Sequence, residues 1–496
     1  MRGLSWLGVV ALAAAMVAGC SADNSGTDGS RGNLTNGGGF GNATDGTSSD
    51  GTDPAAGGFG NSGGNTAGGD TGTTPVFTQP PVTVEASFIW IANSAQGTVS
   101  KLDTRTMTEL GRYLTSPNGT GLPSRTSVSD SGDVAVANRG NATAQMPNPP
   151  DGGGVTKIYA DVANCEDKNG NGTIETSTGA GDVLPWGQEE CVAWYTPINH
   201  FSNRPVQWAP APAPDAPADV WTAGATTCDF GGCSFDAFRL DGVTGAIKDT
   251  VSIAGLTGVD MITAGGIDPT MLGPAGLLIG LLPPSTLILN YGPYGGVADA
   301  GGNFWIFNSN TTHLIRIDAV TLQWRSWTTP MGNGYGITID SQGRIFVCGT
   351  LGVSRFDPPT ESWYSTWEAG ATVDLGYNGC MTDGMGTLWV GGGSDQGQIG
   401  LFGISTESLQ LVDQVNTDDQ GNQMRVKGVS IDIDGNVWGV SSPGADMSGP
   451  GNLAWRFNPL TREVASYDGL EGAYSYSDMT GFGLQQAGFK EPPPLE

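Results

Sequence analysis

The stretch that decides the fold is Gly336-Ile-Thr-Ile-Asp340-Ser-Gln-Gly343-Arg-Ile-Phe346, together with the segment Val353-Ser-Arg-Phe-Asp357 that follows it. Apolar residues alternate with polar ones on both sides of Asp-x-x-Gly, as in two β-strands that each bury one face. Asp and Gly supply the backbone geometry of a tight hairpin turn. The stretch therefore predicts an antiparallel hairpin whose aspartate has a structural role.

The same unit recurs along the chain, about every 40–50 residues where nothing is inserted, which is typical of four-stranded propeller blades. Clear copies begin at Gly379 and Gly428, and weaker ones lie near Ser127, Asp219 and Gly295. A half unit at 88–103 starts the series and lacks its inner strand. The C-terminal stretch 474–483 can supply that strand and close the ring. The sequence thus predicts an all-β, seven-bladed β-propeller of four-stranded antiparallel blades.

The repeat divides the chain into segments. We expect a signal peptide at 1–19, a flexible linker rich in Gly, Asn, Ser and Thr at 20–82, a propeller at 83–488 and a short tail at 489–496. The linker has too few apolar residues to order itself. Residues 141–200 break the period and are predicted to be an insertion between the second and third blades. Residues 250–290 are predicted to be a buried elaboration of the third blade.

The N-terminus has the features of a lipoprotein signal. An uncharged apolar run ends in Val17-Ala18-Gly19-Cys20, and small residues before a cysteine are typical of lipidation at that cysteine. We expect lipid on Cys20 to hold the protein to the bacterial cell envelope. Ser21 is permissive for outer-membrane sorting, so we expect an outer-membrane lipoprotein that faces the periplasm or the exterior.

Charge limits the partners. The formal net charge is −28. An acidic surface repels nucleic acid and anionic lipid headgroups, so neither is an expected ligand. The expected contact with a membrane is therefore through lipid on Cys20. We expect a monomer, for which an envelope protein or a glycan is a possible ligand.

Six cysteines remain besides Cys20, and an even number in an exported chain indicates disulfides. The count allows fifteen connectivities, which sequence alone does not resolve. We predict pairing between neighbours in sequence, namely Cys165–Cys191, Cys228–Cys233 and Cys348–Cys380.

The repeated unit, with an apolar strand that ends in Asp-x-x-Thr, resembles the virginiamycin B lyase (streptogramin lyase) family of seven-bladed propellers. The resemblance covers most of 85–485 and implies a fold more strongly than an activity. It implies a lyase mouth with histidines and glutamates around Mg²⁺, where a streptogramin ring is opened by elimination. In those lyases a histidine often precedes the glycine that opens a blade. Here that position is never histidine, so Mg²⁺ is expected only if the chain is a lyase.

The same register predicts which side chains line the mouth. Four of them stand directly before the opening glycine of blades four to seven, and three come from extending the register: Tyr294, Tyr335, Asn378, Lys427, Arg125, Arg204 and Asp478. Three cations in an acidic protein favour an anionic or polar ligand. The alternative is a water-filled channel whose polar groups satisfy one another.

A second motif lies in the insertion. Asp167, Asn169 and Asn171 place oxygen ligands at positions 1, 3 and 5 of a calcium loop, Gly172 allows the turn, and Thr173 and Glu175 follow. Position 12 is Thr178 rather than Glu, and Asp182, Glu189 or Glu190 could replace the missing carboxylate. We predict a structural Ca²⁺ site; the alternative is a solvated turn that binds nothing.

These features favour a lipid-anchored binding or scaffold module that has no catalytic residues. The alternative is a metal-assisted enzyme that resembles streptogramin lyase and opens a cyclic peptide or cleaves a polysaccharide. The missing mouth histidines favour the first, because histidine is the usual general base near neutral pH.

Overall fold

The computed structural model of this chain describes residues 87–140, 153–213, 216–229, 232–257, 292–309, 311–330, 334–349, 352–370, 378–392, 400–416, 426–442 and 451–487. The predicted signal peptide, Cys20, the linker and the tail lie outside the described residues, as does most of the predicted elaboration at 250–290. None of the helices in these ranges is long and apolar enough to cross a bilayer.

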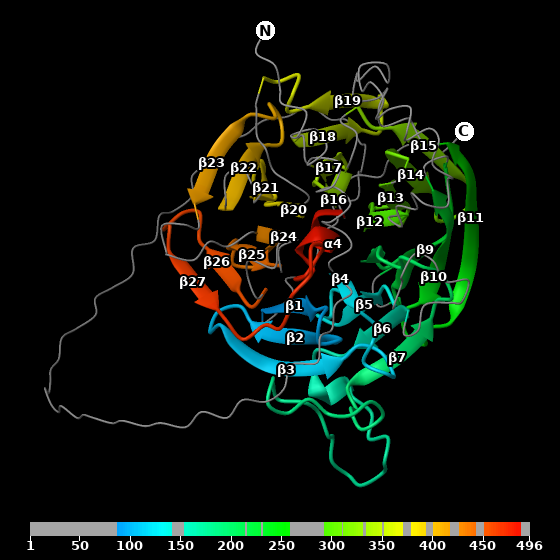
Figure 1. Cartoon of the computed structure of the whole chain (residues 1–496), viewed down its shortest axis with the longest axis vertical. Helices are drawn as coiled ribbons and strands as arrows, with labels where there is room; N and C mark the ends of the chain where they lie inside the picture. The colour runs from blue at the N-terminus through cyan, green and yellow to red at the C-terminus, as the bar shows by residue number, and fades with distance from the viewer. Residues whose placement is uncertain are drawn as a thin grey trace, which may run out of the picture. The chain divides into compact units, whose positions relative to one another are not determined.

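Residues 87–487 form a ring of seven small antiparallel sheets around a central axis (Figure 1). This is the predicted seven-bladed β-propeller. The first sheet has three strands, β1 (Phe88–Asn93), β2 (Thr98–Asp103) and β3 (Thr108–Leu114). The other six sheets have four strands each, in sequence order from the axis outward.

The strands of the second to fourth blades follow one another along the chain. They are β4 (Pro123–Val128), β5 (Val134–Asn138), β6 (Gly154–Ile158) and β7 (Val192–Pro197); then β8 (Val206–Trp208), β9 (Asp219–Asp229), β10 (Gly232–Asp241) and β11 (Ile247–Thr257); then β12 (Pro293–Ala298), β13 (Phe304–Asn308), β14 (His313–Ile317) and β15 (Trp324–Thr328).

The fifth to seventh blades are the most regular repeats in the sequence. Their strands are β16 (Gly334–Ile339), β17 (Ile345–Gly349), β18 (Gly352–Asp357) and β19 (Ser362–Ser365); then β20 (Cys380–Thr382), β21 (Thr387–Gly392), β22 (Gly400–Ser405) and β23 (Leu411–Asn416); then β24 (Val426–Ile431), β25 (Val437–Ser441), β26 (Ala454–Phe457) and β27 (Val464–Tyr467).

The Asp-x-x-Gly turns have the structural role that the sequence predicted. Asp340 Oδ1 accepts the backbone N–H groups of Gln342 and Arg344, and Gly343 takes a φ of +76° that disfavours other residues. In the fourth blade the turn aspartate Asp299 also accepts the indole N–H of Trp305 at 2.7 Å. These turn carboxylates thus stabilise their hairpins by accepting N–H groups of the turn and of the strand that follows it.

Apolar side chains fill the space between neighbouring blades. Trp305 and Phe307 of the fourth blade pack with Ile337, Ile345 and Phe356 of the fifth, and all five are buried. The core is therefore a series of layers between sheets, and each blade depends on the next for burial of its apolar faces.

The C-terminal segment closes the ring, as predicted. Residues 473–479 lie beside β1, where the N–H of Trp90 donates to the carbonyl of Met479 at 2.8 Å and that of Tyr474 to the carbonyl of Ala92 at 2.9 Å. Asn93 and Ala473 form a bridge. The segment therefore covers the otherwise free edge of the first sheet.

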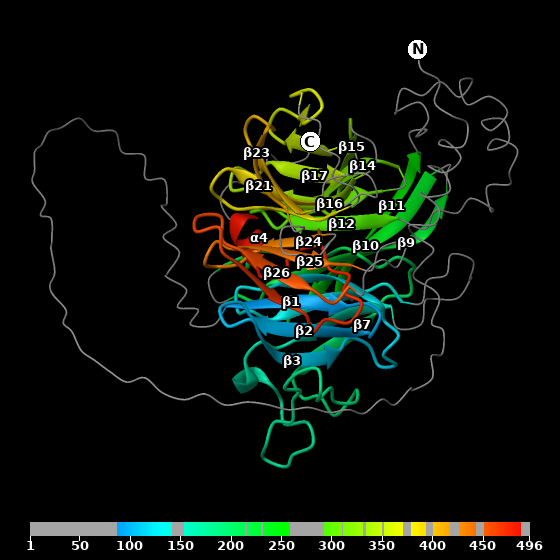
Figure 2. The ribbon, with the colours of Figure 1, turned by 60° about the vertical axis from the view of Figure 1, so that its left-hand side comes forward.

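A short helix follows that segment. Helix α4 (Phe482–Gln486) packs against several blades: Leu484 joins the apolar cluster of blades two and three, and Phe482 contacts that of blades six and seven. Ala487, directly after the helix, joins the cluster of blades four and five. The helix therefore lies across one end of the central axis (Figure 2). The sequence analysis did not predict this helix.

The insertion is shorter than predicted, and it lies within the second blade instead of between the second and third blades. Residues 141–200 include two strands, β6 and β7, so the insertion is 159–191 and joins the outer strands of the second blade. It contains a 3₁₀ turn, η2 (Val162–Asn164), and projects from the rim of the ring (Figure 1). The alternating residues of β6 and β7 were hidden by the polar, glycine-rich segments around them.

Two predicted disulfides are confirmed. Cys165–Cys191 links the two ends of the insertion, and Cys348–Cys380 joins β17 to β20 of the next blade. Cys228 and Cys233 lie opposite each other in the β9–β10 register. The side chain of Cys228 lies outside the part of the structure that is described, so the third disulfide stays a prediction.

Candidate functional site

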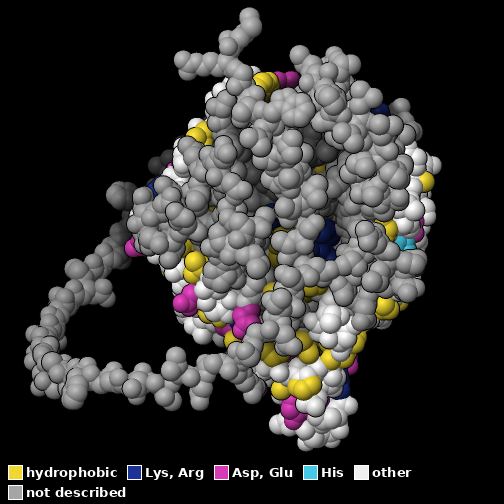
Figure 3. Space-filling view, in the orientation of Figure 1, with side chains coloured by type: hydrophobic (Ala, Val, Ile, Leu, Met, Phe, Trp, Pro, Cys, Tyr) yellow, Lys and Arg dark blue, Asp and Glu magenta, His cyan; other side chains and the backbone are white. Residues whose placement is uncertain are grey.

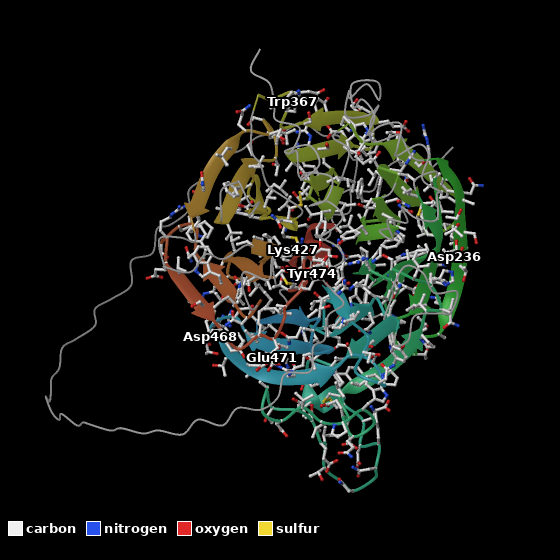
Figure 4. All side chains as sticks on the ribbon, viewed as in Figure 1. Asp236, Trp367, Lys427, Asp468, Glu471 and Tyr474 are labelled. Carbon is white, nitrogen blue, oxygen red and sulfur yellow. A yellow bond between two sulfur atoms is a disulfide. The ribbon has the colours of Figure 1, made fainter. Side chains whose placement is uncertain are left out.

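The predicted mouth residues lie where the inner strands begin. Arg125, Tyr294, Tyr335 and Lys427 are in β4, β12, β16 and β24, while Arg204 and Asn378 lie two residues before the first residues of β8 and β20. The register that placed them before or near an opening glycine therefore brings them to one end of the axis. Lys427 and Tyr474 are seen there at the centre of the ring (Figure 4).

The closing segment adds two tyrosines that the sequence analysis did not select. Tyr474 and Tyr476 pack with Tyr294 and Tyr335 into one cluster, which we call the tyrosine cluster. The ring centroids of Tyr335 and Tyr476 lie 4.6 Å apart. The hydroxyl of Tyr474 hydrogen-bonds to that of Tyr294 at 3.0 Å and to that of Tyr335. Three hydroxyl groups thus meet at one point.

Arg125 lies beneath the cluster and is fully buried. Its guanidinium stacks on the ring of Tyr476 at 3.8 Å and donates to the carbonyl oxygens of Tyr335 and Tyr476 at 2.9 and 3.4 Å. Its Nε is buried without a hydrogen-bond partner. Burial lowers the pKa of Arg125, because removing a cation from water disfavours its charge.

Arg204 is half-buried and lies over the ring of Tyr294 at 4.7 Å. It donates from Nε to Ser202 Oγ at 3.1 Å and from Nη1 to the hydroxyl of Tyr476 at 3.3 Å. Burial acts to raise the pKa of the Tyr476 phenol, but Arg204 and Arg125 outweigh it and bring that pKa down to about 7. Burial instead raises the pKa of Tyr335 well above its ordinary value.

Two further cations complete the mouth. Lys427 Nζ lies 4.0 Å from the ring centre of Tyr335, and the guanidinium of Arg139 lies 4.8 Å from that of Tyr474. Lys427, Arg204 and Tyr474 are half-buried, whereas the other mouth residues are buried. Lys and Arg side chains are accordingly visible in the middle of this face (Figure 3). Asn378 donates its amide to the carbonyl of Gly391 and supports the inner strand.

Asp478 does not join these residues, contrary to the prediction. Its carboxylate accepts the backbone N–H groups of Gly481 at 2.8 Å and Leu484 at 3.1 Å, at the start of α4. Burial raises its pKa to about 6, although the backbone N–H groups act in the opposite direction. The chain turns after Tyr476 to enter the helix, so the carboxylate of Asp478 binds backbone N–H groups at the helix start instead of facing the mouth.

The two histidines lie outside the mouth. His200 Nε2 is 2.7 Å from Asp236 Oδ2 within the third blade, and His313 begins β14 in the fourth. Neither stands at the opening of an inner strand, so the mouth lacks the histidines that the lyase resemblance implies.

The predicted calcium loop is solvent-exposed and internally hydrogen-bonded. Asp167 accepts the backbone N–H groups of Gly170, Asn171 and Gly172, while the amides of Asn169 and Asn171 donate to Glu175 at 2.7 Å each. Thr173 donates to Asn171 Oδ1. No group of three or more His, Cys, Asp and Glu in the described ranges is arranged to hold a metal. The Ca²⁺ site therefore stays a prediction.

The three carboxylates considered for the twelfth position have other partners. Glu190 accepts the backbone N–H groups of Lys168, Asn169 and Glu175, and Glu189 accepts those of Ser177 and Cys191. Asp182 accepts the hydroxyl of Thr178. Glu189 and Glu190 are buried, so they order the insertion from within.

The chain is similar to several solved structures at low sequence identity. The chain is similar to virginiamycin B lyase. A catalytically inactive form of that enzyme from Staphylococcus aureus with Quinupristin matches at 14% identity and a TM-score of 0.39, over 70% of this chain and 83% of the other.

Two other solved structures are similar at the same level. A functionally unknown protein from Desulfotomaculum acetoxidans matches at 10% identity and a TM-score of 0.48, over 79% of this chain and 98% of the other. A putative 6-phosphogluconolactonase from Bacteroides fragilis matches at 11% identity and 0.48, over 80% and 99%. No family profile and no curated protein matches the sequence. These likenesses concern the fold and carry no argument about activity.

Proposed function

We propose that this protein is a lipid-anchored envelope propeller whose mouth binds a ligand, as a binding module and not as a catalyst. The observation that carries the proposal is the group of half-buried Arg204, Lys427 and Tyr474 at one end of the axis. A concave site with a few convergent polar groups is the usual form of a ligand site. The envelope location rests on the predicted lipid at Cys20.

The proposal also rests on what the mouth does not contain. Neither histidine is there, and no metal-ligating group of acids lies in the described part of the chain. Tyrosine hydroxyls and cations can hold a ligand by hydrogen bonds and charge without a metal. An envelope glycan with acidic groups, or an acidic protein segment, fits such a mouth.

A glycan array probed with the mature protein tests this function. We expect binding to a subset of acidic glycans, and we expect Lys427→Ala to weaken it about tenfold, the effect of losing one charged hydrogen bond. Lys248→Ala is the matched control, because Lys248 is an exposed lysine that pairs with Asp219 on the rim of the third blade. Equal losses in both variants would count against a site at the mouth.

Mass spectrometry of a streptogramin B antibiotic, incubated with the protein and Mg²⁺, tests the enzymatic alternative. We expect the antibiotic to stay cyclic. A linear product would replace the binding function by a lyase activity that uses mouth residues other than histidine.

A further inference from the structure

Two arginines of the mouth, the buried Arg125 and the half-buried Arg204, have carbonyl and hydroxyl partners instead of carboxylates. Elsewhere Arg112 pairs with Glu109 at 2.8 Å and Arg344 with Asp340 at 2.7 Å. Neither Arg125 nor Arg204 forms an ion pair with an acid. A buried cation without a counter-charge is costly, so something must neutralise it.

The phenol of Tyr476 contacts both guanidinium groups. Its hydroxyl lies 3.3 Å from Arg204 Nη1, and its ring lies 3.8 Å from the guanidinium of Arg125. Two cations favour the ionised form of this phenol, and its pKa of about 7 reflects them. The position of Tyr476 thus lets its phenol offset part of the charge of the two arginines.

Arg204 can also bind an external anion. A guanidinium has five N–H donors, and the described residues accept two of them, at Ser202 and Tyr476. Because Arg204 is half-buried, its remaining donors are within reach of solvent. Lys427, whose Nζ lies 5.6 Å from the ring centre of the half-buried Tyr474, adds a second cation to the mouth. Such donors suit the oxygens of a carboxylate or sulfate group.

We infer that the mouth takes a ligand with an oxyanion group, which binds Arg204 in place of the negative charge on Tyr476, so that binding takes up a proton at Tyr476. The inference rests on the proposed function and names its ligand class. The proton comes from solvent and stays on the phenol oxygen; no covalent bond to the ligand forms or breaks.

The groups around the phenol set the direction of this coupling. An anion beside Arg204 offsets the charge that favours the phenolate, so the pKa of Tyr476 rises on binding. With a pKa of about 7 in the empty mouth, binding at that pH takes up about half a proton per site. The titratable and charged groups facing Tyr476 are Arg125, Arg139, Arg204, Tyr294, Tyr335 and Tyr474.

The first test needs no ligand. Near-ultraviolet absorbance of the phenolate, followed against pH in the full protein, is expected to show one tyrosine that ionises near pH 7. Tyr476→Phe should remove that step. Tyr467→Phe is the matched control and should retain it, because burial raises the pKa of Tyr467 to about 12. The inference is wrong if no step occurs near pH 7 or if Tyr476→Phe keeps it.

The second test is calorimetric titration with glucuronate or inorganic sulfate, in buffers of different ionisation enthalpy. Both probes keep their charge near neutral pH, and glucose is the neutral control. We expect proton uptake, and an affinity that falls up to about tenfold from pH 6 to pH 8 as the phenolate forms. Tyr476→Phe should bind without that pH dependence, and Arg204→Gln should bind about ten- to a hundredfold more weakly.

The two probes distinguish a sugar-acid carboxylate from an inorganic-type oxyanion. Binding without proton uptake would overturn the coupling but leave the proposed function. If neither probe binds while glycan binding still depends on Lys427, the ligand class is wrong and the proposed function stands. Failure of both the probes and the glycan array would remove the proposed function, and this inference with it.

Discussion

Glycine at the start of an inner strand lets that strand pack closely against the neighbouring segment. A methyl group on Gly428 would overlap the carbonyl oxygen of Ser475 in the closing segment. The same crowding occurs at Gly336, where a Cβ would lie 2.9 Å from the carbonyl oxygen of Asn378. The glycine that opens the inner strand in blades four to seven is therefore needed for close packing of neighbouring blades.

Gly428→Ala should destabilise the protein by about 1–3 kcal/mol, the usual cost of forcing an extra methyl into a packed core. Chemical denaturation monitored by tryptophan fluorescence measures it as a lower midpoint. Gly181→Ala is the control, because an added Cβ at Gly181 meets nothing within 4 Å. A change below about 0.5 kcal/mol in both variants would contradict the packing argument.

Asp478 should make stability depend on pH. Its pKa of about 6 in the folded protein lies above the value of 3.8 for a free aspartate, so the folded state binds the proton more tightly. The contribution of Asp478 protonation to the free energy of unfolding is small at pH 7 and grows as the pH falls through 6 toward 4. The free-energy difference between wild type and Asp478→Ala should thus increase by about 2 kcal/mol from pH 7 to pH 4.5. A difference that is constant with pH would mean that Asp478 titrates normally.

The insertion at 159–191 is ordered by hydrogen bonds to two buried glutamates and by a disulfide rather than by an apolar core of its own. Its exposed loop presents the carboxylates of Asp167 and Glu175, which accept hydrogen bonds from backbone and amide N–H groups of the loop. A bound cation would therefore add stability to a segment that already has a defined form.

If the loop binds Ca²⁺ with a dissociation constant of about 10⁻⁴–10⁻³ M, Ca²⁺ at about 1 mM should protect the insertion by about 0.4–1.4 kcal/mol. Limited proteolysis of the insertion, with Ca²⁺ or with a chelator, measures this protection. Asp167→Ala should abolish the difference, whereas Glu361→Ala, which removes an exposed carboxylate from the fifth blade, should preserve it. Identical cleavage rates in Ca²⁺ and chelator would mean that the loop is a solvated turn.

The blades could be predicted because their signal is local and repeated. An alternating run, an Asp-x-x-Gly turn and a second run specify a hairpin wherever they occur, as in β16 and β17. Helix α4 escaped prediction because five residues have no helical period to detect, and its position depends on contacts with several blades. The strands β6 and β7 escaped because an insertion separates them.

Six of the seven mouth residues chosen from the register lie at the openings of the inner strands, since one position in a repeat maps to one place in the ring. The wrong prediction, Asp478, and the two tyrosines that were not selected, Tyr474 and Tyr476, all belong to the closing segment, where no repeat gives the register. Tyr474 and Tyr476 alternate with serines, a period-two signal that could have placed both on one face. The position of the Asp478 side chain depends on the turn into α4, which the alternation of tyrosine and serine does not predict.

Closure of the whole ring depends on one serine as well as on the backbone. Ser477 Oγ accepts the N–H of Thr126 at 3.0 Å and donates to the carbonyl of the same residue at 2.6 Å. The closing segment thus binds β1 through its backbone and β4 through this side chain. Because the segment follows the seventh blade, these contacts join the last blade to the first two.

Ser477→Ala should lower the free energy of unfolding by about 2–3 kcal/mol, because it leaves two buried backbone groups of Thr126 unpaired. Ser475→Ala is the matched control two residues away; the hydroxyl of Ser475 is buried without a hydrogen-bond partner, so its removal should not destabilise the protein. Thermal unfolding of both variants measures the difference. Equal stability of the two variants would show that the backbone contacts alone close the ring.

Within the described residues, α4 and Ala487 cover one end of the axis and contact the apolar clusters of six blades. A ligand that reaches the tyrosine cluster must leave by the way it entered. A long polymer therefore cannot be threaded through the ring, and can offer the centre only a chain end or a side group. The number of ligands held at one time then depends on the number of such ends, and not on the length of the polymer.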